Sequence, residues 1–187
     1  MTIVNVFEQP YEVWETRDPT PKERLEYLTN CGTMLYSVNT KLVDTIADHF
    51  SAAEYILKYE ADNGLEFRID AYLHDSKEFN DLLNAMPKDL PRSVYDYKHG
   101  YADCQLDAVT SDIEKYGVNL SEKQYLFHGG FFACKPGDHF VLDRPLSTSF
   151  CPQVALRNAE WKGKAYEAGE VHLLVLNVVT SKTKAFV

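Results

Sequence analysis

The sequence predicts an α+β fold, with an N-terminal helical half followed by a small split β-sheet. Apolar residues recur at helical spacing through much of 20–116, whereas short runs rich in β-branched and aromatic residues follow residue 120. Because the helices come first and the strands later along the chain, the pattern favours the α+β class. The length of 187 residues suits one compact domain. Within it we distinguish a helical part, 1–100, from a strand-rich part, 101–187.

The first predicted helix begins near Thr20, after a mixed and polar stretch. Thr20 is a typical N-cap, Pro21 suits the first helical position, and Glu23 lies in the first turn. Apolar residues then recur at helical spacing, and we expect this stripe to pack in the core: Leu25, Leu28, Met34, Leu35, Val38, Leu42, Ile46 and Phe50.

A second helix is expected from Ser51, which is followed by Glu54 in a capping-box spacing. The pair Asn63–Gly64 is expected to end this helix, because both residues favour turns. Residues 65–73 alternate in character, and their pattern leaves both a strand and a helix open.

Asp75–Met86 predicts a short helix that Pro87 stops. The following segment, 87–100, contains prolines and ends in a glycine, which predicts a loop or a hinge. Its aromatic run, 95–101, could line a substrate or partner surface, or pack against the sheet.

In the strand-rich part, the amphipathic pattern of 103–116 predicts a helix that ends at Gly117. The elements after this helix are expected to be short extended pieces at 125–127, 140–142 and 147–150, a helix at 151–161, and an apolar strand at 171–179.

The formal net charge of −9 at pH 7 predicts an acidic surface. Such a surface repels phosphate backbones, so nucleic-acid binding is not expected, whereas a basic protein partner is compatible with it. The longest apolar run, Val171–Val179, is too short to span a bilayer, and the N-terminus lacks the basic start of a signal peptide. We therefore expect a soluble protein with no membrane partner, located in its own cytoplasm or delivered into that of a host.

The four cysteines, Cys31, Cys104, Cys134 and Cys151, are widely spaced and form no CxxC motif. Without clustered Cys and His residues, no metal site is expected. Free thiols are the expectation, and a disulfide pair stays open. Cys134 and Cys151 also raise the hypothesis of a Cys–His nucleophile with His128, although no orienting acid supports it.

Three features of the strand-rich part are expected to form one site. The first is Phe127–Gly130, with the sequence FHGG, which places an imidazole at the rim of a sheet beside backbone that has no Cβ. The second is Ser147–Ser149, where the two serines share one face of a strand and the threonine between them takes the other. The third is the apolar strand Val171–Val179, which would lie next to the other two.

In this order, the three features resemble the mono-ADP-ribosyltransferase family. Its members carry an aromatic-Arg-Gly strand, a Ser-Thr-Ser strand that leads into a helix, an apolar strand, and then a Glu-x-Glu loop. The resemblance covers residues 103–187. It implies a split β-sheet of ADP-ribosyltransferase type, NAD as the co-substrate, and a toxin-like transferase that acts on a protein.

The resemblance assigns NAD binding to three residues. His128 stands where the arginine-specific branch has Arg, and histidine is typical of the diphtheria-toxin and poly(ADP-ribose) polymerase branch. By this resemblance, His128 would hydrogen-bond a ribose hydroxyl of NAD. The backbone of Gly129, followed by Gly130, would hold the amide of the nicotinamide.

The resemblance makes the Ser-Thr-Ser motif the candidate catalytic set. Ser147 would brace the nicotinamide end of NAD, while Thr148 and Ser149 would shape the strand. A structural alternative stays open for Ser149, which could serve as the N-cap of the next helix. Arg144 or Arg157 could contact the pyrophosphate, but single arginines are mostly solvated or ion-paired.

One part of the family pattern is missing, because no acid follows Glu170 in the sequence. The family's glutamate follows the apolar strand, where its carboxylate stabilises the oxocarbenium character that develops as nicotinamide leaves. Glu167 and Glu170 precede that strand and are expected at its wrong end. The sequence therefore fits a fragment of a longer enzyme, an acid supplied by a partner, or a fold kept for binding.

Two functions follow from these patterns. One is NAD-dependent mono-ADP-ribosyl transfer to a protein, or the NAD-binding portion of such an enzyme. The alternative is a catalytically inactive ADP-ribosyltransferase-like module that binds a partner protein. Only the first predicts that NAD raises the melting temperature, since a ligand bound by the native state alone stabilises that state.

Overall fold

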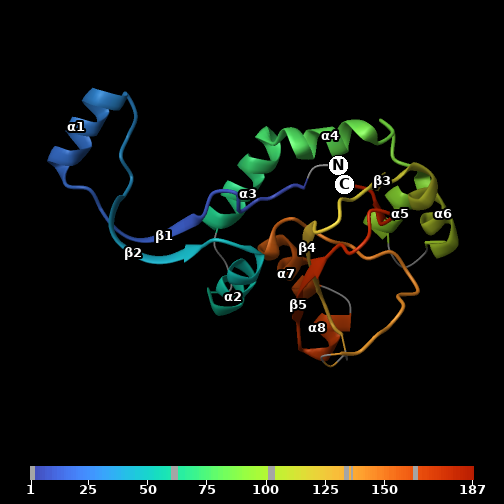
Figure 1. Cartoon of the computed structure of the whole chain (residues 1–187). Coiled ribbons are helices and arrows are strands. Elements are labelled where there is room, and N and C mark those ends of the chain that lie inside the picture. The colour runs from blue at the N-terminus through green and yellow to red at the C-terminus, as the bar shows by residue number, and fades with distance from the viewer. Residues whose placement is uncertain (1–2, 60–62, 101–103, 133–134, 136, 162–163) are drawn as a thin grey trace. The chain divides into compact units, whose positions relative to one another are not determined.

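In a computed structural model, residues 3–59, 63–100, 104–132, 135, 137–161 and 164–187 are described, and the chain forms two compact units. The first, which we call the ribbon unit, is Phe7–Ala52, and the second, the main unit, comprises Met1–Val6 and Ala53–Val187. Helices and small antiparallel sheets occur together (Figure 1), so the α+β class is confirmed. The division at residue 100 stays a prediction.

The ribbon unit is a two-stranded antiparallel ribbon with a helix in its connection (Figure 1). Strand β1, Tyr11–Arg17, pairs with β2, Val38–Ile46. Helix α1, Pro21–Cys31, begins with Thr20 as its N-cap, which confirms that prediction, and Glu23 completes a capping box that was not predicted from the sequence. The Thr20 hydroxyl accepts from the N–H of Glu23 at 3.3 Å, and the Glu23 carboxylate accepts from the N–H of Thr20 at 2.8 Å.

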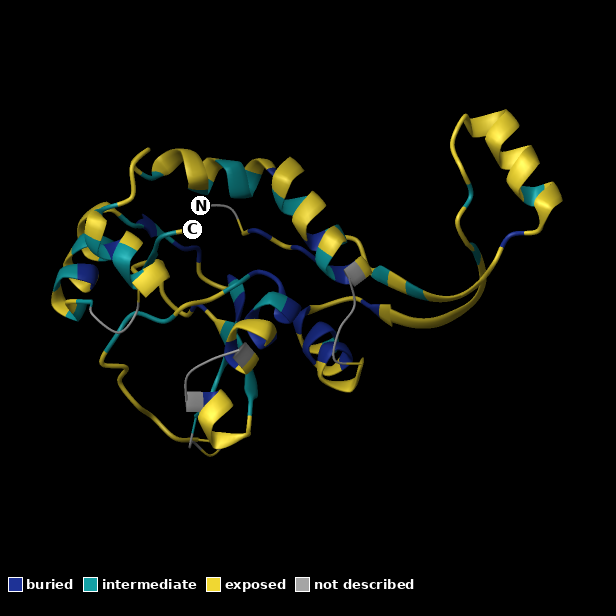
Figure 2. Ribbon diagram, turned by 180° about the vertical axis from the view of Figure 1, so that it is seen from behind, coloured by how far each residue is buried: buried dark blue, intermediate teal, exposed yellow. Residues whose placement is uncertain are grey.

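The expectation of a helical, buried stripe from residue 25 to residue 50 is wrong. Gly32 adopts a left-handed conformation with φ of 69°, which ends α1, and the apolar residues beyond it lie in β2 instead. Helix α1 buries no residue, and Leu25 is 66% exposed. The polar stretch before Thr20 also contains the unpredicted strand β1. A two-stranded ribbon leaves most side chains facing water, and Figure 2 shows this unit as largely exposed.

Helix α2, His49–Tyr59, confirms that a second helix follows, and it buries Ala52 and Ile56. The capping box expected from Ser51 and Glu54 is wrong, because α2 begins two residues before Ser51 and the Asp48 carboxylate accepts from the N–H of Ser51 at 2.8 Å. Residues 65–73 belong to α3, Asn63–Asp75, so the open question there is decided in favour of a helix. The expectation that Asn63–Gly64 ends the second helix is wrong, because α2 ends at Tyr59 and the pair forms the first turn of α3.

Helix α4, Lys77–Ala85, confirms the short helix before Pro87, and the Ser76 hydroxyl caps it. The loop predicted for 87–100 is confirmed for residues 87–91 but wrong for the rest, since α5, Arg92–Gly100, lies there. Proline is well tolerated at the start of a helix, and the carbonyl of Pro91 accepts from the N–H of Tyr95 at 3.0 Å. Helix α6, Leu106–Tyr116, confirms most of the helix predicted for 103–116, of which residue 103 lies outside the described residues.

The strand-rich part centres on β4, Tyr125–Gly130, which pairs antiparallel with β5, His172–Asn177. Helix α7, Pro152–Trp161, packs against this pair, and α8, Lys164–Ala168, follows it (Figure 1). A second small sheet pairs β3, Val118–Asn119, with β6, Lys184–Ala185. The strands β4 and β5 and helix α7 are confirmed, whereas 140–142 forms no strand.

The core of the main unit includes β4, where Phe127 is fully buried. The N-terminal segment lies beside the start of this strand, because the Gln124 side chain accepts from the N–H of Val4 and donates to its carbonyl, both at 2.9 Å. None of the described helices has the length and apolar character needed to cross a membrane.

Candidate functional site

The three sequence features expected to form a site lie together on the two sides of β4. On one side, β4 pairs with β5, so that His128 lies opposite Leu174. On the other side, the N–H of Phe127 donates to the carbonyl of Ser149 at 2.7 Å, and the N–H of Ser149 donates back at 2.8 Å. The Ser-Thr-Ser segment therefore runs along the edge of β4 that β5 does not occupy.

The His128 imidazole joins β4 to this segment. Its Nδ1 lies 2.5 Å from the carbonyl oxygen of Ser147. A carbonyl oxygen only accepts, so Nδ1 carries the proton, and in the neutral ring Nε2 is left as an acceptor. The ring is half-buried, and the edge of Phe132 meets it with the centroids 5.3 Å apart at 80°.

Gly130 leaves room beside the accepting nitrogen of His128. A Cβ at position 130 would lie 2.7 Å from Nε2 of His128 and 3.1 Å from the ring of Phe132. Residues two apart in a strand share a face, so only the missing side chain keeps this side of the imidazole open. The glycine therefore makes Nε2 accessible to a hydroxyl donor.

Gly129 has a different role, because its face of β4 is covered by α7. A Cβ there would lie 2.1 Å from the carbonyl oxygen of Ala155 and 2.9 Å from the Cβ of Ala159. The N–H and C=O groups of alternate strand residues point to the same edge, so those of Gly129 follow those of Phe127 towards the Ser-Thr-Ser side. The helix thus requires glycine, and the backbone of this glycine is directed to the edge beside Ser147.

Ser149 is not the N-cap of α7, the alternative that the sequence left open. Its hydroxyl accepts from the N–H of Cys151 at 3.0 Å, which forms a local turn before the first helical residue, Pro152. Ser147 and Thr148 are exposed, and it is the carbonyl of Ser147, not its hydroxyl, that contacts His128. The catalytic roles expected for Ser147, Thr148 and Ser149 stay predictions.

Tyr97 supports the site and was not singled out from the sequence. Its hydroxyl donates to the carbonyl of Pro145 at 2.6 Å and so fastens α5 to the segment that leads into Ser147. The signal was the aromatic run 95–101, of which residue 101 lies outside the described residues. Among the described residues of this run, Tyr97 anchors the loop before Ser147, whereas Tyr95 stacks on His99 within the same helix.

Glu170 lies just before β5, as the sequence predicted. Because β4 and β5 are antiparallel and Gly130 lies opposite His172, this is the end of the sheet where the two glycines are. Glu170 comes four residues before Leu174, the partner of His128, which is roughly 13 Å along a strand. Its carboxylate accepts from Nε2 of His172 at 2.9 Å.

The other candidate side chains, a cysteine and two arginines, are buried or held in ion pairs. Burial raises the pKa of the Cys151 thiol, so it is not a thiolate, and this argues against the Cys–His hypothesis. Cys134 lies outside the described residues. Arg157 forms a two-point ion pair with Glu66, at 2.7 and 3.3 Å, and Arg144 pairs with Asp143 at 2.8 Å. The described residues contain no cluster of His, Cys, Asp and Glu suited to a metal ion.

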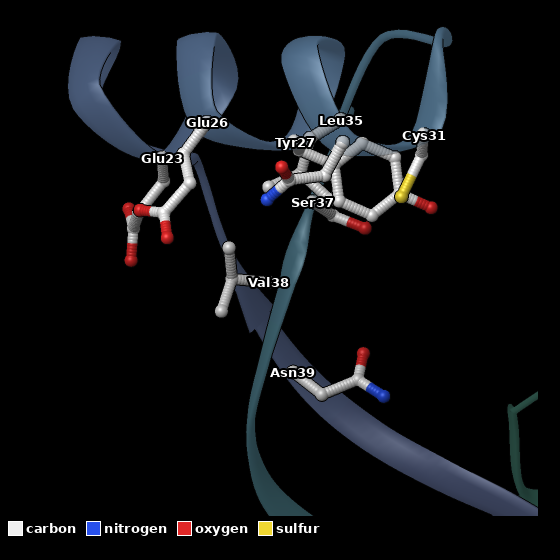
Figure 3. A pocket seen from close by; sticks show the side chains of 9 residues that line it. Glu23, Glu26, Tyr27, Cys31, Leu35, Ser37, Val38 and Asn39 are labelled. Carbon is white, nitrogen blue, oxygen red and sulfur yellow. The ribbon is translucent and has the colours of Figure 1, made fainter.

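Two open cavities lie outside the His128 region. One, of about 560 Å³, is lined by α1 and the start of β2 in the ribbon unit. Figure 3 shows Tyr27, Leu35 and Cys31 on its wall. The other, of about 530 Å³, lies in the main unit between α3 and the start of α7. Ser149 lines the second cavity, so this part of the Ser-Thr-Ser segment faces a hollow surface.

Comparison with known proteins adds no relative, since no family model, curated protein or solved structure matches the chain. The function is therefore argued from the site alone.

Proposed function

We propose that the β4 site binds NAD and that the chain is a mono-ADP-ribosyltransferase acting on a protein, or the NAD-binding portion of one. The observation that carries the proposal is the contact between His128 and Ser147, which brings an imidazole and the Ser-Thr-Ser segment to one edge of β4. Both were named from sequence as parts of one pocket.

The residues at this edge offer hydrogen-bonding groups suited to two parts of NAD, the carboxamide and one ribose hydroxyl. A carboxamide has one donor and one acceptor group, and the backbone of Gly129 offers the complementary pair at the edge beside Ser147. The neutral imidazole of His128 offers Nε2, beside Gly130, as an acceptor for a ribose hydroxyl. Ser147 would brace the nicotinamide end, Thr148 would shape the strand, and Ser149 would hold the start of α7.

Transfer breaks the bond between nicotinamide and ribose and joins the ribose carbon to a nucleophile of the target protein, which loses a proton. A carboxylate beside the ribose would stabilise the positive charge that develops. Residues 171–187 contain no acid, and Glu170 is bound to His172. We therefore assign NAD binding to this site and the carboxylate to a group outside 171–187.

The test is the melting temperature of the chain with and without millimolar NAD. NAD should raise it, and His128→Ala should abolish the rise, because the imidazole supplies a ligand contact. His139→Ala is the matched control, since His139 is an exposed loop histidine. If wild type shows no rise, or if the two variants behave alike, the proposal fails. Release of nicotinamide, measured in parallel, separates transfer from binding alone.

A second function, a module that binds a partner protein, is favoured by one observation. The ribbon unit exposes large apolar side chains without a core to cover them, with Tyr36 at 80% exposure. Such a module would form a stable complex that Tyr36→Glu and Leu25→Glu disrupt, with no effect of NAD. A complex unaffected by both substitutions would contradict this function.

A further inference from the structure

His172 makes one contact through each of its two ring nitrogens, and together these contacts select one tautomer. The N–H of Phe132 donates to Nδ1 at 3.2 Å. A backbone N–H can only donate, so Nδ1 is unprotonated and Nε2 carries the proton. This proton is directed to the carboxylate of Glu170, 2.9 Å away. The ring therefore serves at once as an acceptor for the segment after β4 and as a donor to the segment before β5.

The two phenylalanines that follow β4 pack on two different histidines. The Phe131 ring stacks on His172, with the centroids 5.5 Å apart and the planes at 28°. The Phe132 ring meets His128 edge-on, at 5.3 Å and 80°. Edge-to-face and offset stacked pairs are the favoured aromatic geometries, so each contact restricts the orientation of both rings.

These contacts form one continuous path from Glu170 to the candidate site. Glu170 orients His172, His172 holds the backbone of Phe132, and the ring of Phe132 rests against His128. The opposite side of the His128 ring is held by the carbonyl of Ser147. Without the hold on the Phe132 backbone, the ring of Phe132 would lose its fixed position against His128.

We propose that His172 is a positioning residue for His128. It fixes the segment after β4 through Nδ1, and thereby sets the orientation of the imidazole whose Nε2 faces the open side at Gly130. The inference about His128 orientation stands on the contacts alone, whereas its consequence for NAD rests on the proposed function. The sequence suggested only an ordinary strand residue at this position.

Two substitutions of His172 separate the contacts. In His172→Asn, the side-chain oxygen lies near the former Nδ1 and can still accept from the N–H of Phe132. In His172→Gln, the amide reaches the former Nε2 and can keep the contact with Glu170, but no acceptor remains for Phe132. If His172 acts through Nδ1, His172→Asn should keep the wild-type orientation of His128, and His172→Gln should not.

The first readout is the NMR signals of the His128 ring, without NAD. They are shifted by the ring current of Phe132, so His172→Gln should move them and His172→Asn should leave them close to wild type. His128 signals that are identical in all three proteins, or that move equally in the two variants, would overturn the proposal. If His172→Gln prevents folding, Glu170→Ala replaces it as the test, because this carboxylate is exposed. Glu170→Ala should move the His128 signals away from their wild-type positions, and no movement would count against the proposal.

The second readout is the affinity for NAD. A lost positioning contact corresponds to about a tenfold weaker affinity, so His172→Gln should bind about tenfold more weakly and His172→Asn about as well as wild type. His139→Gln is the control for a histidine removed elsewhere. If His172→Gln moves the His128 signals but wild type binds no NAD, the positioning stands and the proposed function fails. If NAD binds equally well to all variants and the signals do not move, the positioning fails and the proposed function stands.

Discussion

The ribbon unit and the β4–β5 sheet are both small antiparallel pairs, but they are held together by different interactions. In the ribbon unit, the two strands pair with each other, but α1 buries nothing and its contacts are local: the Thr20 capping box and the Arg17–Glu23 ion pair at 2.6 Å. Around β4, both edges of the strand are bonded, one to β5 and the other to Ser149, and α7 packs on one face. The exposed ion pair contributes little to stability, whereas the buried strand depends on packing.

This difference explains where a binding site can form. The backbone of His128 is paired with β5, and its imidazole is held by the Ser147 carbonyl and the Phe132 ring, so its orientation does not depend on one contact. In α1, the exposed apolar side chains such as Leu25 are not buried against any other element. Ligand chemistry that needs a defined geometry is therefore expected beside β4 and not on the ribbon unit.

The largest expected effect comes from removing the buried ring in β4. Phe127 is fully buried, so Phe127→Ala should lower the free energy of unfolding by about 4 kcal/mol. Leu25→Ala in α1, at 66% exposure, should lower it by less than about 0.5 kcal/mol. Urea unfolding of both variants measures the contrast. Equal losses of unfolding free energy in the two variants would show that packing around β4 stabilises the protein no more than packing of α1 does.

The next effect compares two glycines with different constraints. Gly129→Ala brings a Cβ into the backbone of α7, 2.1 Å from the Ala155 oxygen, and should cost about 3 kcal/mol. Gly32→Ala meets no atom within 4 Å, but its φ of 69° suits glycine, so it should cost about 1 kcal/mol. Thermal and urea unfolding give both values. A mild effect at Gly129 would mean that α7 can move away from β4.

A pH dependence is expected where the ribbon unit does bury a titratable group. Burial lowers the pKa of His49 from 6.5 to about 4, and the ring packs edge-on against Phe7 at 5.1 Å. Between these two pH values, the unfolded chain binds the proton and the folded chain does not, so the free energy of unfolding falls as the pH falls. Between pH 7.5 and 5, the loss should be about 1–2 kcal/mol, allowing for residual screening by water.

The variant His49→Leu isolates this contribution, because carboxylates titrate in both proteins and cancel in the difference. Wild type should lose more stability than the variant between pH 7.5 and 5, as measured by urea unfolding at each pH. The same pH dependence in both proteins would contradict the assignment to His49.

The sequence predicted the elements whose signals are local or strongly apolar. The Thr20 N-cap, the helix at 151–161 and the apolar strand that became β5 are of this kind. The meeting of His128 with the Ser147–Ser149 segment was also expected, although by resemblance to a family rather than by a spacing rule. These patterns succeed because a few neighbouring residues carry the whole signal.

The elements that were missed depend on information that lies outside the local pattern. An apolar stripe from Val38 to Phe50 fits a helix, and only the left-handed Gly32 and the partner strand β1 make Val38–Ile46 a strand. The path from Glu170 to Phe132 depends on the register of β4 with β5, which brings residues 40 apart in sequence into contact. Register is a tertiary property, so no spacing rule could have revealed it.

The smallest expected effect tests whether the ribbon unit is stabilised locally. Thr20→Ala removes the hydroxyl that accepts from the N–H of Glu23, and an N-cap of this kind contributes about 1 kcal/mol. Thr29→Ala is the control, since its hydroxyl bonds the Leu25 carbonyl within the same helix and caps nothing. Hydrogen exchange should speed up at the α1 amides in Thr20→Ala alone and stay unchanged at the β4 and β5 amides. Faster exchange in β4 would mean that the two units unfold together, and the contrast between local and tertiary stabilisation would then not hold.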